Sequence, residues 1–129
     1  MLLKTPVSVG EILDKLSILE IKSERIQDES KLVNIKKELN MLLDLLGSID
    51  GLLESVEELY SSLKSVNEEL WVIEDDIRVK ESRKEFDEEF IRLARAVYVT
   101  NDKRANVKKQ INLRLGSELI EEKSYEDYT

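Results

Sequence analysis

The side chains that could carry out chemistry in this chain are carboxylates, lysines, arginines and tyrosines. The 129 residues include no cysteine and no histidine, which excludes thiol nucleophiles, thiolate metal sites and catalysis by an imidazole base. Several of these side chains follow helical spacing in two stretches, residues 67–78 and residues 92–112. A site in this protein is therefore expected to draw on these two stretches.

Two cations of the second stretch lie where a helix would bury them. Arg104 and Lys108 are four residues apart and share a helical sector with an apolar stripe. A buried cation is costly unless it is paired or reaches water. One interpretation is a structural salt bridge to Glu74 or Asp75. The other is a site for a phosphate or carboxylate group, which arginine binds well, completed by neighbouring side chains: Arg92 or Arg95, and Asn112.

A mixed stripe of the first stretch surrounds the single tryptophan. Asn67, Trp71, Glu74 and Arg78 follow one another at intervals of 4, 3 and 4, so they share one flank of a helix, and Glu74 and Arg78 form a favourable i,i+4 pair. The stripe is either the edge of an apolar seam that Trp71 covers, or a polar pocket that has Trp71 as its floor.

The carboxylates do not favour a metal site or an enzyme. Glu74, Asp75 and Asp76 are consecutive, and successive helical residues point about 100° apart, so they do not converge on one Mg²⁺ ion. Helical nucleotide pyrophosphohydrolases need two acidic pairs on facing helices. Glu54 and Glu57 give one such pair, but a second pair with the spacing Glu-x-x-Asp is absent downstream on this helix. A chorismate-type mutase would need an arginine that the first helix does not supply. We expect no metal and no cofactor, and we favour a role other than catalysis.

Charge is segregated along the chain. The net charge is −8, yet residues 42–77 hold ten acids and one base, whereas residues 78–114 hold eleven bases and six acids. Two interpretations are open: two helical arms that attract each other, or a basic site for an anion. The segregation of charge favours the first. A net acidic protein repels phosphate backbones, so a nucleic-acid partner is not expected. No apolar run approaches the about 20 residues of a membrane-spanning helix, and we expect a cytoplasmic protein.

The hydrophobic pattern predicts an all-α fold, an antiparallel hairpin or bundle of about five helices in one domain spanning residues 1–129. Residues 1–7 read as an extended lead-in, and residues 117–129 as an acidic tail, either a last helical turn or a flexible end. The strongest signal is a heptad pattern over residues 52–77. Capping residues predict where the helices begin and end: Ser8, Asp28, the turn at 47–51, Ser82, the cap at 100–102, and Gly116.

The first helix predicts self-association. Ile18 and Ile21 lie opposite the main apolar stripe of that helix, and one small bundle cannot easily cover both sides. We therefore expect a homodimer or higher oligomer.

The sequence resembles an uncharacterised family of small helical proteins, domain of unknown function 6165. The matching stretches are VSVGEILDKL at 7–16, LWVIEDDIR at 70–78, FIRLAR at 90–95, NDKRA at 101–105 and EKSY at 122–125. The resemblance implies a bacterial or phage origin and an association with cell-surface polysaccharide genes, but no activity. It also implies that the polar motif residues are the ones to test. Together with the side chains that helical spacing singles out, these residues make up the candidate ligand- or partner-binding set: Trp71, Glu74, Asp75, Arg78, Arg92, Arg95, Asn101, Asp102, Arg104, Lys108 and Asn112.

Two functions follow as expectations. The favoured one is an accessory interaction module that associates with itself. The alternative is a small binding protein or enzyme for an anionic metabolite, such as a nucleotide or a nucleotide-sugar. The environment of Arg104 and Lys108 discriminates between them: acids of the same chain favour the module, and an open cationic cleft favours the ligand.

Overall fold

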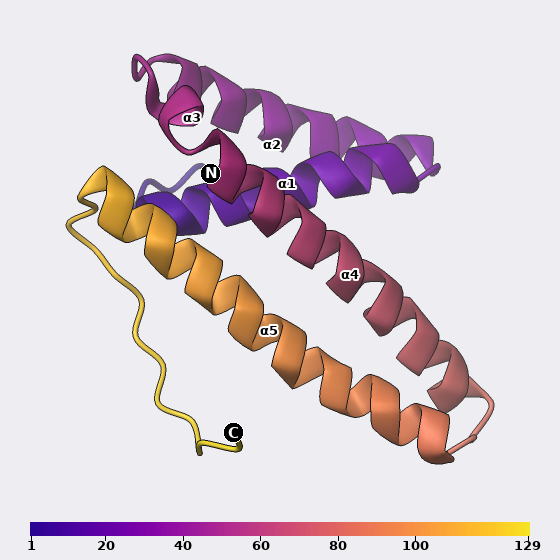
Figure 1. The fold of residues 1–129 in the computed structure, drawn as a ribbon. Helices are drawn as coiled ribbons and strands as arrows, with labels where there is room; N and C mark the ends of the chain where they lie inside the picture. Colours follow the sequence, from indigo (N-terminus) through magenta and orange to yellow (C-terminus); the bar gives the residue numbers. More distant parts are fainter.

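The fold consists of helices joined by short turns and followed by an extended tail. The computed structural model describes all residues from Met1 to Thr129. It confirms the all-α prediction, with no strand in the chain. As Figure 1 shows, two layers cross: α1 and α2 form one, and the longer α4 and α5 form the other. The helices are α1 (Val9–Arg25), α2 (Glu29–Gly47), α3 (Leu52–Ser55), α4 (Glu57–Ser82) and α5 (Glu88–Leu115).

The predicted caps of the first two helices are confirmed. The Ser8 hydroxyl accepts a hydrogen bond from the Glu11 amide at 3.1 Å, and the Asp28 carboxylate accepts from the amides of Ser30 and Lys31 at 3.0 and 3.3 Å. Each cap satisfies amides that the first helical turn leaves without an intrahelical acceptor. The turn at 47–51 separates α2 from α3, with Gly51 in the left-handed region at φ 72°.

The predicted continuous helix over residues 52–77 is wrong at its start. The backbone leaves the helical region at Val56 (φ −126°, ψ 21°), so α3 ends at Ser55 and α4 begins at Glu57. Val56 is fully buried, and the break directs its side chain into the core. The Ser55 hydroxyl also donates to the Leu52 carbonyl at 2.6 Å, a local bond that competes with helix continuation.

The predicted fourth and fifth helices are one helix, α5. Its cap is Asp87, whose carboxylate accepts from the Phe90 amide at 3.0 Å; Ser82, the predicted cap, is instead the last residue of α4. The helix runs without interruption through the predicted cap at 100–102. Thr100 is buried there, and α4 packs along α5, so tertiary packing outweighs the local capping tendency. Gly116 ends α5 in the left-handed region at φ 63°, as predicted.

The core lies where α1 crosses the α4–α5 hairpin. Leu13 and Leu16 of α1 cluster there with four more buried apolar side chains: Leu46, Val56, Leu63 and Ile111. Beyond this crossing the hairpin continues as two helices alone (Figure 1). Between residues 68 and 103 the buried residues are Leu70, Leu93 and Thr100. The far half of the hairpin therefore has a single narrow seam.

Helix α1 is covered on two sides within one chain. Ile21 is 1% exposed and Ile18 is partly buried, because α2 packs on one side of α1 and α4 and α5 on the other. Ile18 and Ile21 therefore need no second copy of the chain to cover them. No helix is both long and apolar enough to cross a membrane.

Candidate functional site

A buried carboxylate stands at the crossing of α1 with the hairpin. The Asp14 side chain is 2% exposed. The Arg104 guanidinium holds it with two hydrogen bonds, from Nε to Oδ1 at 2.9 Å and from Nη2 to Oδ2. This bidentate arrangement matches the planar geometries of the two groups, and the hydrogen bonds to Asp14 raise the pKa of Arg104.

Helix α4 adds an amide to the same carboxylate. The Asn67 Nδ2 donates to Asp14 Oδ1 at 2.9 Å and to Ser17 Oγ at 2.7 Å, and the Ser17 hydroxyl donates to the Asp14 carbonyl at 2.8 Å. Asn67 and Ser17 are both buried. No buried side-chain nitrogen or oxygen in the protein lacks a partner, so the network is complete without a ligand.

A second cation of α5 lies one turn further along. The Lys108 side chain is only 10% exposed, and its Nζ lies 2.8 Å from Glu11, 3.1 Å from Glu121 and 3.8 Å from Asp14. Burial alone lowers the pKa of Lys108, but the hydrogen bonds to Glu11 and Glu121 outweigh burial, and the pKa lies above its usual value. Glu121 belongs to the C-terminal tail, so this cation also holds the tail against α5.

A close approach of two backbones sets the register of this site. The Gly10 amide donates to Asn112 Oδ1 at 2.6 Å. A Cβ at Gly10 would lie 2.7 Å from the Lys108 carbonyl, a distance that real Cβ atoms do not tolerate. The absence of a side chain at Gly10 thus brings α1 onto α5, and Asp14, one turn later, reaches Arg104.

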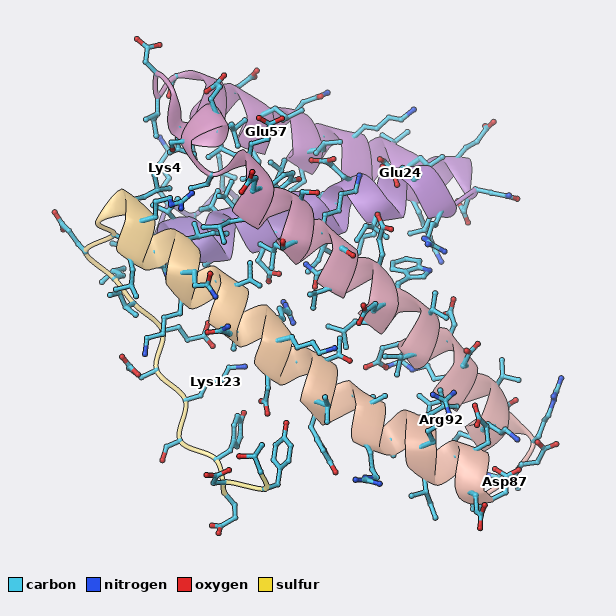
Figure 2. The ribbon with its side chains drawn as sticks, in the orientation of Figure 1. Lys4, Glu24, Glu57, Asp87, Arg92 and Lys123 are labelled. Carbon is cyan, nitrogen blue, oxygen red and sulfur yellow. The ribbon has the colours of Figure 1, made fainter.

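A separate polar group bridges α1 and α4. The Tyr60 hydroxyl donates to Glu20, and Lys64 Nζ lies 2.7 Å from Glu24 and 3.2 Å from Glu20. Burial and the hydrogen bond to Glu20 raise the pKa of Tyr60 well above its usual value. Figure 2 shows Glu24 near the far end of α1.

The structure brings together four of the predicted site residues. Arg104, Lys108 and Asn112 contact α1, and Asn101 Oδ1 accepts a 3.5 Å hydrogen bond from Arg104. Asp102 lies outside this cluster and accepts a hydrogen bond from the Tyr128 hydroxyl.

The predicted partners of Arg104 are wrong. Glu74 pairs instead with Arg78 at 3.2 Å on the exposed side of α4, and Asp75 is exposed. Helix α1 explains the difference, because it supplies Asp14 to the sector that Arg104 faces. The predicted completion by further arginines is also wrong, since Arg92 is exposed and pairs with Glu89 at 2.5 Å. The remaining candidates lie apart from the cluster, Trp71 partly buried and Arg95 exposed.

Sequence reasoning missed the acceptor side of the network. Gly10, Asp14, Ser17 and Ile21 follow at intervals of 4, 3 and 4, which is a second helical stripe beside the apolar one, and all four are buried. Small and polar residues in such a stripe indicate close helix contact and buried hydrogen bonds. This spacing was the signal that could have identified Asp14.

The arrangement is suited to holding helices together. Each charge of the cluster faces an opposite charge from the same chain, and no group of three or more acidic side chains could hold a metal ion. A hollow of about 230 Å³ lies beside the cluster, and its charged lining consists of Arg104, Lys108 and Lys123 together with Glu11 and Glu121. Two of its three cations, Arg104 and Lys108, are therefore paired with acids of the same chain.

Comparisons with known proteins place the chain in a family. No curated protein and no solved structure matches it. Residues 3–128 match the model described as Family of unknown function (DUF6165). Because this match covers nearly the whole chain, including the tail that holds Glu121, the protein belongs to that family.

Proposed function

We propose that this protein is an accessory interaction module that associates with a second copy of itself through the far half of the α4–α5 hairpin. One observation carries the proposal: this half extends beyond the core and keeps large apolar side chains in water. These residues are spread over α4, the turn and α5, and we call them together the distal patch: Val72, Val79, Phe86 and Ile91, which are 45%, 44%, 57% and 55% exposed. We further propose that the protein acts in the cytoplasm, in keeping with its lack of cysteine.

The geometry of a two-helix projection favours burial by a partner. An isolated hairpin has one seam, here formed by Leu70 and Leu93, and such pairs gain stability when further helices cover their outer sides. Val72 and Val79 are seven residues apart and therefore share one side of α4. Covering apolar surface contributes about 25 cal/mol per Å², so association at the distal patch would stabilise the hairpin.

Charge complementarity indicates that the occupant is a second copy. Near the patch, α4 presents Asp75 and Asp76, whereas α5 presents Arg95 and also Arg92, which is shared with Glu89 of its own chain. A two-fold axis along the hairpin would place α4 of each copy against α5 of the other, so that the acids of one copy face the arginines of the other.

The cationic cluster supports this role over the binding of an anionic metabolite. Arg104 and Lys108 are both matched by acids of the same chain, Asp14, Glu11 and Glu121. An external phosphate would have to displace a carboxylate that is already bound.

The test is the molar mass in solution, measured by light scattering after gel filtration over a range of concentrations. The wild type is expected to exceed the monomer mass of 15.0 kDa. Ile91→Glu places a charge in the distal patch and should return the mass to 15.0 kDa. Val33→Glu is the matched control, because Val33 is 68% exposed on α2, away from the patch, and it should leave the mass unchanged.

Two results would contradict the proposal. One is a wild type of monomer mass at every concentration. The other is an equal effect of both substitutions, which would show that added charge and not the patch is responsible. Circular dichroism of each variant would verify that its helices are intact.

A further inference from the structure

The C-terminal tail and α5 border a second, larger hollow that is open to solvent. The tail leaves α5 at Gly116 and runs back beside it, as Figure 1 shows. It is attached at two points, through Glu121 to Lys108 at 3.1 Å and through the Tyr128 hydroxyl to Asp102. Near the second point lies a hollow of about 880 Å³, a size within the usual range for small-molecule sites. We call it the tail groove.

Aromatic rings form the walls of the tail groove. The ring centroids of Tyr98 and Tyr128 are 5.1 Å apart, and their planes meet at 52°, so the rings form a wedge instead of a stack. Tyr125 is a third ring of the lining. The Lys123 ammonium lies 6.0 Å from the centroid of the Tyr125 ring, and in Figure 2 this side chain extends from the tail towards α5. The faces of these rings attract cations.

The charges left over in the tail groove are negative. Its lining includes the carboxylates of Asp102, Glu126 and Asp127 and a single cation, Lys123. None of these three carboxylates forms a salt bridge with a cation of the chain, in contrast to the acids around Lys108. The uncompensated charge of the tail groove is therefore negative. Arg104 and Lys108 alone would have suggested a positively charged site.

We infer that the tail groove binds a small organic cation, an ammonium group that carries alkyl substituents. Tyrosine faces bind the diffuse charge and the alkyl surface of such a group, and the carboxylates of Asp102 and Asp127 compensate its charge. A bare metal ion fits less well, because it needs several converging oxygen ligands and no acidic group of the chain offers them. None of the groove residues belongs to the distal patch, so this inference is independent of self-association.

The test is an NMR titration of the full-length protein with tetramethylammonium chloride and, separately, with spermidine, each against sodium chloride at equal ionic strength. Saturable shifts are expected in the amides of residues 97–105 and 123–129. Tyr98→Ala and Asp102→Asn should each weaken binding by about tenfold, within the range that cation–π and charge contacts contribute. The matched controls are an exposed apolar side chain and an exposed acid of α2, outside both the tail groove and the distal patch, Val33→Ala and Asp44→Asn, and they should leave the dissociation constant unchanged.

Further variants keep the test decisive if Tyr98→Ala loses helicity. Glu126 and Asp127 lie on the exposed tail, so Glu126→Gln and Asp127→Asn leave the helices intact and should still weaken binding. The inference is overturned if the organic cations cause no saturable shift, or if sodium chloride causes the same shift. It is also overturned if the control variants weaken binding as much as the groove variants, or if adenosine monophosphate binds at these residues and the cations do not.

Discussion

Removing the Asp14 carboxylate is the sharpest perturbation that the structure suggests. In Asp14→Ala, the Arg104 guanidinium loses both of its hydrogen bonds to the carboxylate, and the Asn67 amide loses one acceptor. Both groups stay in their places because α5 and α4 hold them. A cation that remains partly buried without its partner is destabilising, and this cost exceeds the value of the contact itself.

The expected loss follows from burial. Breaking a buried ion pair by removing one partner costs about 3–5 kcal/mol. The Arg104 side chain, however, is 29% exposed, whereas that of Asp14 is 2% exposed. Water can therefore solvate part of the guanidinium after it loses its partner. We therefore expect Asp14→Ala to lower the free energy of unfolding by about 2–4 kcal/mol.

The assay is urea denaturation followed by circular dichroism at equal buffer and salt. Arg104→Met in the Asp14→Ala background should add little further loss, because the unpaired cation has been removed, and the two changes should couple by about 1–3 kcal/mol. Glu74→Ala is the control, since its exposed pair with Arg78 contributes at most about 1 kcal/mol. A loss below about 1 kcal/mol in Asp14→Ala, or strict additivity in the double mutant, would refute the assigned pairing.

Three further outcomes are expected. Gly10→Ala should destabilise by about 1–3 kcal/mol in the same urea assay, because the added Cβ meets a carbonyl of α5; an unchanged midpoint would mean that the helices separate freely. Leu63→Ala should cost about 3–5 kcal/mol, because Leu63 is fully buried in the core, and Leu70→Ala, at 8% exposed on the hairpin seam, should cost less; equal losses would contradict the placement of the core. The pKa of Tyr60 is raised in the folded protein, so its stabilisation is present below the usual value of 10.0 and lost as pH rises above it. Denaturation as a function of pH should therefore show the stability advantage of wild type over Tyr60→Phe shrinking above pH 10.0, whereas a constant difference would rule out the hydrogen bond to Glu20.

Local sequence was sufficient for the helix ends that depend on neighbouring atoms. Ser8 and Asp28 cap helices with their own side chains, and Gly116 ends α5 because glycine adopts positive φ without strain. These interactions span three or four residues, so the residue type at one position fixes them. The all-α class followed in the same way from the 3.6-residue periodicity.

Tertiary packing decided where local signals conflicted. The heptad continues through Val56, yet the helix breaks there and the side chain is fully buried. The capping residues at 100–102 are present, yet α5 continues because Thr100 is buried in the middle of a long helix. Periodicity shows which side chains share a face, but it does not show whether the backbone between them stays helical. The break at Val56 and the continuation through residues 100–102 could therefore not be predicted from the sequence.

The candidate site divides in the same way. The sequence by itself determined that Arg104 must face an anion, because its angular position lies in an apolar stripe and an unpaired guanidinium there is costly. Only the tertiary structure decided that the anion is Asp14, 90 residues away along the chain. The choice depends on how α1 is placed across the hairpin, which the bare backbone of Gly10 permits. A helical pattern gives the direction of each side chain around its own axis, but the crossing of two helices is set by how closely their backbones can approach.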